Sequence, residues 1–292
     1  MTKPLPFDDF RAVRIVLEPD DYALGPSKPD LPTDLIDEET WRHIMILPDE
    51  VSVRTSNHHG KLLRELNELD STWVEYAVGD DEDLLHEVLI YMMDEFDAIL
   101  YNALHGYYRQ AIGCLRNVLE LVTYGTLWQI TNNVTEFKQW NEGQKEMRFG
   151  ESCDKLSHID RIQGLEAHLH VALNDSLFDQ KNKTSDGGWA RRLYSELCQY
   201  SHSRPNYTNA GLWNSNGPLY VARSFKITYS LYYDITALSY LLIKLARPDF
   251  TLPEEITKLL RSYRRSSDKV PYESYKFLFG RRGMRQKQKI AS

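Results

Sequence analysis

Cysteine is scarce in this chain of 292 residues, which contains only Cys114, Cys153 and Cys198. An odd number of cysteines, with no CxxC motif and no cysteine–histidine ligand spacing, provides neither a disulfide framework nor a zinc site. Such usage is typical of free thiols in a reducing compartment. The first ten residues carry Asp8 and Asp9 in place of a basic flank and an apolar run, so we expect no signal peptide. These absences together predict a cytoplasmic protein.

The chain also lacks a long uninterrupted apolar run. Its longest hydrophobic stretch, residues 227–246, includes Asp234, Lys244 and four tyrosines. These groups would be costly to bury in a bilayer about 30 Å thick, so we interpret the stretch as a buried helix and expect no membrane partner. Hydrophobic residues make up 42% of the chain and charged residues 26%, which is the balance of a globular protein.

Several common catalytic motifs are missing. The sequence contains no GxxxxGK[ST], GxGxxG, HExxH or GxSxG, so the signatures of P-loop ATPases, dinucleotide-dependent dehydrogenases, zinc proteases and α/β hydrolases are absent. His168 and His170 are two positions apart, which on a helix turns their side chains about 200° from each other. They cannot bind one metal from the same helix, and we expect neither a metal site nor a cofactor.

The negative charge is concentrated near the N-terminus. Residues 1–100 hold 24 acidic and 8 basic residues, whereas the remainder holds 18 acidic and 27 basic residues. Residues 1–60 also contain seven of the twelve prolines, so we expect an irregular acidic arm there. Residues 266–292 are expected to form a basic C-terminal tail, which either contacts phosphates or is a solvated terminus. The helical domain is predicted between these segments, over residues 61–265.

Apolar residues recur at intervals of three and four from residue 61 onward. This spacing predicts helices over residues 61–77, 84–100 and 108–126. Because the break around Gly106 is short, the second and third of these helices are expected to pack as an antiparallel hairpin. Further helices are predicted over residues 134–145, 159–173, 189–202 and 222–246, and one more begins at Pro253. The predicted fold class is all-α, a helical bundle built on the hairpin.

Two polar stripes lie on these predicted helices. On the second hairpin helix, Arg109, Arg116 and Glu120 fall on the side opposite the apolar face, and the helix predicted after residue 188 carries a stripe that ends at His202. If the stripes face each other, arginine and histidine meet beside the loop of residues 201–218. Arginine binds phosphate oxygens and histidine exchanges a proton near neutral pH. Alternatively, Arg116 and Glu120 form a structural ion pair, and His202 satisfies carbonyls at the helix end.

The loop of residues 201–218 is rich in amides and aromatic residues. A long loop of this kind inside a compact helical domain is usually functional when it is ordered. The candidate binding residues in it are Arg204, Tyr207, Asn209, Trp213, Asn214 and Asn216. Its aromatic side chains either stack on an unpaired base or anchor the loop to the core.

Two sequence runs carry a resemblance to known proteins. The run LHGYYRQAIGCLRNVLELVTYG, residues 104–125, and the run LYSELCQYSHSRPNYTNAGLWNSNGPLY, residues 193–220, resemble a set of uncharacterised bacterial all-helical proteins that are similar in layout to HEPN-like domains. The resemblance covers roughly residues 84–250. It implies a compact helical bundle, often dimeric, and in many members a metal-independent ribonuclease activity in toxin or antiviral systems.

The motif of that family is an arginine followed after four to six residues by a histidine. The arginine holds the phosphate and the histidine transfers a proton. The spacing occurs at Arg54 to His59 and at Arg161 to His168, which is no more often than chance predicts for this composition. The expected site therefore depends on residues that the fold must bring together.

The sequence supports more than one interpretation of function. In the first, the protein is a HEPN-like effector that binds or cleaves RNA without a metal, with His202, Arg116 and Glu120 at the catalytic centre and Arg109 among the phosphate contacts. In the alternative, it is a non-catalytic helical sensor or partner-binding subunit whose asparagine-rich loop contacts a ligand or protein. In a third interpretation, the acidic arm and the basic half are complementary surfaces through which copies of the chain associate, for example as a homodimer.

Overall fold

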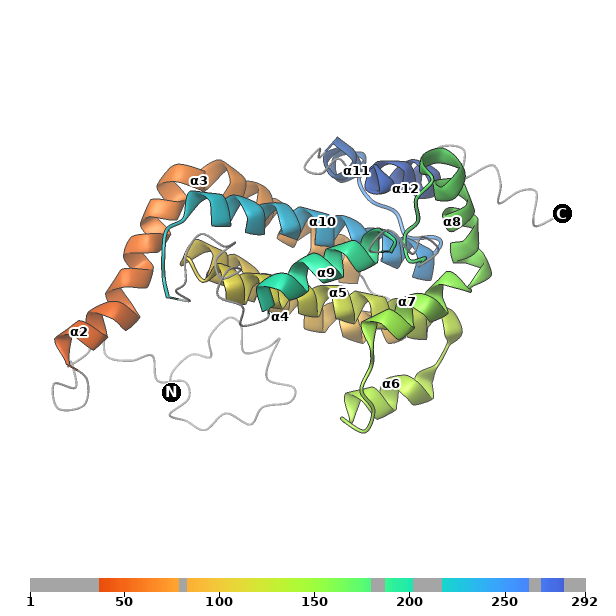
Figure 1. Ribbon diagram of the computed structural model, residues 1–292, viewed down its shortest axis with the longest axis horizontal. Helices are drawn as coiled ribbons and strands as arrows, with labels where there is room; N and C mark the ends of the chain where they lie inside the picture. Colours follow the sequence, from red (N-terminus) through yellow and green to blue (C-terminus); the bar gives the residue numbers. More distant parts are fainter. Residues whose placement is uncertain (1–36, 79–82, 180–186, 202–216, 263–268, 281–292) are drawn as a thin grey trace, which may run out of the picture. The chain divides into compact units, whose positions relative to one another are not determined.

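The computed structural model describes residues 37–78, 83–179, 187–201, 217–262 and 269–280. Within these ranges every regular element is a helix and no strand occurs, which confirms the predicted all-α class (Figure 1). The chain divides into two compact units, Met1–Ile46 and Leu47–Ser292. The described part of the first unit is α2 (Glu38–Trp41) followed by a π-helical turn, η2 (Arg42–Ile46).

The second unit carries the other described helices. They are α3 (Leu47–Thr72), the π-helical η3 (Trp73–Val78), α4 (Leu84–Leu104), α5 (Tyr108–Thr131), α6 (Val134–Asn141), α7 (Phe149–Ser157), α8 (Asp160–Leu173), α9 (Trp189–Ser201), α10 (Ala222–Ala246), α11 (Glu254–Ser262) and α12 (Val270–Phe279). In the described part of the chain, no helix has both the length and the apolar character needed to cross a membrane.

The helices α4 and α5 pack along their lengths in opposite directions. The Asp83 side chain caps α4 by accepting a hydrogen bond from the backbone N–H of His86 at 2.8 Å. The side-chain oxygen of Gln129, near the end of α5, accepts one from the N–H of Leu85 at 3.4 Å. The absence of a side chain at Gly125 lets Leu85 approach α5 closely, because a Cβ there would lie 2.9 Å from its side chain.

The helix α10 is buried on nearly all sides and lies against α5 (Figure 1). Two of its buried hydroxyls are satisfied within the helix, because Thr228 and Ser239 donate to carbonyl oxygens four residues earlier at 3.0 and 2.8 Å. The Tyr275 hydroxyl of α12 donates to the carbonyl oxygen of Ala237 at 2.9 Å. The stretch of residues 227–246, which the sequence predicts to be a buried helix, is therefore a buried helix.

The prediction of an irregular arm over residues 1–60 is wrong for residues 47–60, which are helical. The helix α3 begins at Leu47, and Pro48 lies in its first turn, where the fixed φ of proline suits a helix. The helix has a kink at His59, which has φ −130° and ψ 17°. The His59 ring stacks on Phe225 of α10 with 4.6 Å between centroids.

The prediction of a basic tail over residues 266–292 is likewise wrong for residues 270–279, which form α12. Val270 and Tyr275 are fully buried against the rest of the second unit. The helix packs on α8, α10 and α11. The helix α7 was not predicted either, although Phe149 and Cys153 place it in the core. Both helices are short, and neither has the long apolar repeat that marks α4 and α5.

Candidate functional site

The structure describes three of the predicted site residues, Arg109, Arg116 and Glu120, all on α5. The other predicted catalytic residue, His202, lies outside the described residues. So do the predicted binding residues Arg204, Tyr207, Asn209, Trp213, Asn214 and Asn216.

The guanidinium of Arg116 joins α5 to α9. Arg116 Nε donates to Glu120 Oε1 at 3.1 Å, and Nη2 lies 3.0 Å from the same oxygen. Nη2 also donates to the Tyr194 hydroxyl at 2.9 Å, and that hydroxyl donates to Glu120 Oε1 at 2.9 Å. The guanidinium carbon lies 5.2 Å from the centroid of the Tyr194 ring, within cation–π range. We call these three residues the Arg116 triad.

The surroundings of the Arg116 triad keep Arg116 charged and Tyr194 protonated near neutral pH. Burial lowers the pKa of Arg116, but Glu120, Tyr194 and Cys198 together raise it above its ordinary value. Burial and the neighbouring Glu120 raise the pKa of Tyr194, so its hydroxyl keeps its proton. The side chains of Arg116 and Glu120 are 32% and 23% exposed, which leaves the triad in reach of solvent.

The face of α9 that meets Arg116 carries Tyr194 and, one turn later, Cys198. The Tyr194 ring stacks on Phe149 of α7 with 4.2 Å between centroids, which fixes its position. Cys198 lies one turn further along the same face and close enough to affect the pKa of Arg116. The helix α9 ends at Ser201, directly before His202. Arg116 thus contacts α9 through Tyr194, a residue that sequence reasoning missed and that is not part of the predicted stripe.

The two arginine–histidine motifs have structural roles in the described chain. Arg161 Nη1 donates to the carbonyl oxygen of Leu245 at 2.7 Å, which caps the end of α10. His168 stacks on Phe277 with 4.8 Å between ring centroids. In the other pair, Arg54 lies over the Tyr220 ring and His59 forms the stacked kink of α3. Neither pair supports the phosphate-binding arrangement of the family motif.

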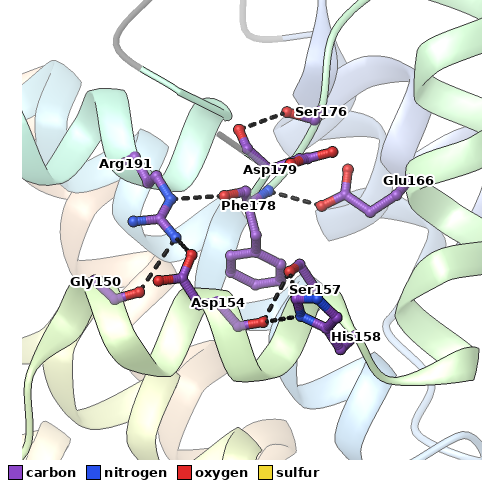
Figure 2. A network of polar contacts seen from close by, with 9 residues as sticks. All are labelled: Gly150, Asp154, Ser157, His158, Glu166, Ser176, Phe178, Asp179 and Arg191. Carbon is purple, nitrogen blue, oxygen red and sulfur yellow. Dashed lines mark hydrogen bonds and ion pairs between the residues drawn. The ribbon is translucent and has the colours of Figure 1, made fainter. Parts of the chain in front are cut away.

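A polar pocket, which sequence reasoning also missed, lies between the end of α7, one face of α8 and the loop of residues 174–179. It encloses about 530 Å³. Glu166 on α8 accepts hydrogen bonds from the backbone N–H groups of Leu177 and Phe178, both at 2.8 Å. Figure 2 shows Glu166 and Arg191 reaching Phe178 from opposite sides. Arg191 Nε donates to the Phe178 carbonyl oxygen at 2.7 Å, so the loop backbone is held from both sides.

The same loop is tied to α9 by a second arginine. Arg192 donates to both carboxylate oxygens of Asp175 at 3.0 Å, the two-pronged geometry that gives arginine–carboxylate pairs their strength. Arg192 Nη1 also donates to the carbonyl oxygen of Gly187 at 2.8 Å. At Gly188 a Cβ would lie 2.4 Å from the Leu177 backbone, so only glycine allows this approach. Glu166, Arg191 and Arg192 together make the wall of the pocket rigid.

Within the ranges that the structure covers, no group of three or more His, Cys, Asp or Glu side chains is placed to hold a metal ion. Comparisons of the chain with protein families, with curated proteins and with solved structures find no match.

Proposed function

We propose that the protein is a HEPN-like effector of a bacterial defence or toxin system that binds RNA and cleaves it without a metal. The observation that supports this proposal is that Arg116 of α5 reaches α9 on the face of Tyr194 and Cys198. That helix ends at Ser201, directly before His202 in the chain, and the proposal requires His202 to lie within reach of the guanidinium. RNA is the proposed partner, together with a second copy of the chain as in the family it resembles.

The Arg116 triad has the chemistry that phosphate binding requires. Glu120 and Tyr194 hold Nε and Nη2, which fixes the plane of the guanidinium. Among the described residues, Nη1 of Arg116 has no hydrogen-bond partner, so its two N–H groups can donate to phosphate oxygens. In this proposal Glu120 positions Arg116. Arg109, two turns earlier on α5, contacts a further phosphate of the RNA strand.

The proposed cleavage needs two proton transfers and no metal. The ribose 2′-oxygen would lose its proton to a base and bond to phosphorus, while the bond from phosphorus to the 5′-oxygen breaks and that oxygen takes up a proton. His202 is the proposed proton-transfer residue, and Arg116 would stabilise the charge on the phosphate. The products would carry a 2′,3′-cyclic phosphate and a 5′-hydroxyl.

The test is cleavage of a labelled single-stranded RNA by the purified full chain in the presence of EDTA. We expect His202→Ala and Arg116→Ala to lower the rate by about 100-fold or more, because each removes a group of the reacting centre. Arg148→Ala is the matched control, because it also removes an arginine that forms an ion pair. Arg148 pairs with Glu151 at the exposed start of α7. The assignment fails if His202→Ala cuts RNA as fast as the parent.

A second candidate function is a non-catalytic helical sensor or partner-binding subunit. The observation that favours it is the ion pair between Arg116 and Glu120, which balances the charge of the guanidinium within the chain. This function predicts that the parent leaves RNA intact and that a defined partner copurifies in fixed stoichiometry. Replacing Tyr207 and Trp213 of the loop by alanine should then release the partner, whereas Arg116→Ala should lower only the stability of the chain.

A further inference from the structure

The kink of α3 lies beside the start of α10, and Tyr220, two residues before α10, joins the two helices (Figure 1). The guanidinium carbon of Arg54 on α3 lies 5.8 Å from the centroid of the Tyr220 ring. The ring of His58, one turn later, stacks on the same ring with 5.3 Å between centroids. The Tyr220 hydroxyl also forms a hydrogen bond of 3.3 Å with Nε2 of His59. Tyr220 therefore holds the exposed basic side of α3 against the start of α10.

The first turns of α10 add further positive charge at this point. Arg223 and Lys226 are one turn apart on the helix, and both are exposed. Burial lowers the pKa of His59, and the charges of Lys226 and His58 lower it further, so Lys226 acts directly on the kink of α3. The N-terminal end of a helix also carries a partial positive charge. We give the name Tyr220 patch to Arg54, His58, Tyr220, Arg223 and Lys226.

The cations of the Tyr220 patch have no anionic partner in the part of the chain that the structure describes. There, the side chains of Arg54, Arg223 and Lys226 form no ion pair and donate no hydrogen bond. Within the same ranges Glu50, one turn before Arg54, forms no ion pair with it, and Glu65 on α3 accepts a hydrogen bond of 2.5 Å from a tyrosine hydroxyl of α10. The segment of residues 202–216, which precedes the patch in the chain, contains no aspartate or glutamate.

We propose that the Tyr220 patch binds the phosphate backbone of single-stranded RNA, as a contact surface separate from the reacting centre at Arg116. The identification of the polyanion as RNA rests on the proposed function. Exposed cations on two neighbouring helices suit a chain of phosphates that runs over the surface. The cation–π contact of Arg54 engages its charge but not its N–H groups, which remain to donate to phosphate oxygens.

The geometry of the Tyr220 patch favours backbone contacts over recognition of bases. The Tyr220 ring is already covered by Arg54 and His58, so it does not offer a free face on which a base can stack. His59 is buried, and its ring is stacked on Phe225, so it does not take part in the phosphate contact. We therefore expect binding with little preference for base sequence.

The Tyr220 patch lies at the same end of the second unit as the start of α5. The Tyr108 hydroxyl accepts a hydrogen bond from the backbone N–H of Val221 at 3.1 Å. A Cβ at Gly106 would lie 2.3 Å from the Leu219 carbonyl oxygen, so the turn before α5 touches the same segment. Arg109 follows Tyr108 directly in the chain. In this proposal an RNA strand that contacts Arg109 continues onto the patch.

The test is binding of a fluorescein-labelled 2′-O-methyl oligouridine to the full chain, measured by fluorescence anisotropy in EDTA. This oligonucleotide lacks the 2′-hydroxyl that the proposed cleavage requires, so binding is measured apart from catalysis. We expect the double variant Arg54→Gln/Lys226→Gln to weaken binding at least about tenfold at about 100 mM NaCl. Between about 50 and 200 mM NaCl, its salt dependence should be shallower by about 1.4, because each single-strand phosphate contact contributes about 0.7 to the slope.

The matched control is Lys138→Gln/Arg148→Gln, which removes one lysine and one arginine at exposed positions. Both positions adjoin the second half of α5, as the contacts of Trp128 with Phe137 and of Tyr124 with Met147 show. The control should bind within twofold of the parent and keep its salt dependence. A selective loss in the patch variant supports the proposal even if the parent leaves ordinary RNA intact, a result that would reject only the proposed cleavage.

Three results would overturn the proposal. The first is a parent chain that does not bind the oligonucleotide. The second is an equal loss of affinity in the two double variants, which would reduce the effect to net charge. The third is displacement of the oligonucleotide by polyglutamate as effectively as by unlabelled oligonucleotide, which would assign the Tyr220 patch to an acidic protein segment.

Discussion

The hydroxyl of Tyr194 on α9 donates a hydrogen bond to Oε1 of Glu120 on α5, with 2.9 Å between the two oxygens. The same hydroxyl accepts from Arg116, so one atom completes a closed ring of three polar contacts between the helices. Each bond is made in a half-buried setting, where a hydrogen bond to a charged group contributes more than one between neutral groups. This ring holds the proposed phosphate-binding arginine in place.

Tyr194→Phe should destabilise the protein by about 1–2 kcal/mol, because it removes both hydrogen bonds and leaves the stacking on Phe149 intact. The measurement is urea unfolding followed by circular dichroism. Tyr101→Phe is the matched control, since Tyr101 is 60% exposed. Its effect should stay within about 0.5 kcal/mol. A similar loss in both variants would show that the ring contributes nothing of its own.

Gly106→Ala and Gly113→Ala should change stability in opposite directions. Gly106 has φ +82°, and a Cβ there would lie 2.3 Å from the Leu219 carbonyl oxygen, so we expect a loss of at least about 2 kcal/mol. Gly113 lies inside α5 with open space around it, and alanine should stabilise that helix by about 0.5–1 kcal/mol. Thermal unfolding of both variants checks this, and a gain at residue 106 would contradict it.

Asp70 should make the stability of the protein depend on pH. Burial and the nearby Asp97 raise the pKa of Asp70 from 3.8 to about 6. Between these two values the folded state binds more protons than the unfolded state, so stability falls as pH rises through this range and stays lower above it. Asp70→Asn removes the charge and should stabilise the protein at pH 7.5 by about 1 kcal/mol, after allowance for solvent screening.

Urea unfolding of the parent and of Asp70→Asn at several pH values between 4 and 7.5 tests this assignment. The advantage of the variant should shrink as the pH falls toward 4, where the carboxyl is protonated in the folded state. Asp97→Asn should give a smaller gain, because it removes only the second cause of the raised pKa. An advantage of Asp70→Asn that is constant or grows toward pH 4 would contradict the assignment.

The long helices α4, α5 and α10 were predictable from the sequence because α4 and α5 each bury a continuous apolar stripe and α10 is apolar on nearly all sides. The predicted bounds of residues 222–246 coincide with α10, and the change to Arg247-Pro248 marks its end. The short helices were not predictable in this way. Pro271 and the basic residues on both sides of α12 hide this helix, which Val270 and Tyr275 anchor in the core. Pro48 likewise gave the start of α3 the composition of a turn. In these cases tertiary packing outweighs the local composition.

The candidate site was predictable only where it follows helical spacing. Arg116 and Glu120 are four residues apart on one helix, so their contact was visible in the sequence. Tyr194 comes from a helix 78 residues away in the chain, and residue types alone do not reveal which side chain crosses between helices. The hydrogen bonds that Glu166 accepts from the loop of residues 174–179 were also not predictable. Their donors are backbone N–H groups, which every non-proline residue possesses.

The position of α10 in the chain has a consequence for how the protein is made. The helix α5 ends at Thr131, but the helix that covers it, α10, begins only at Ala222. At roughly 5–20 residues per second, a ribosome needs several seconds to synthesise the intervening segment. During that time the apolar face of α5 that α10 covers in the folded protein stays exposed on the nascent chain, and exposed surface of this kind favours aggregation until translation has passed residue 246.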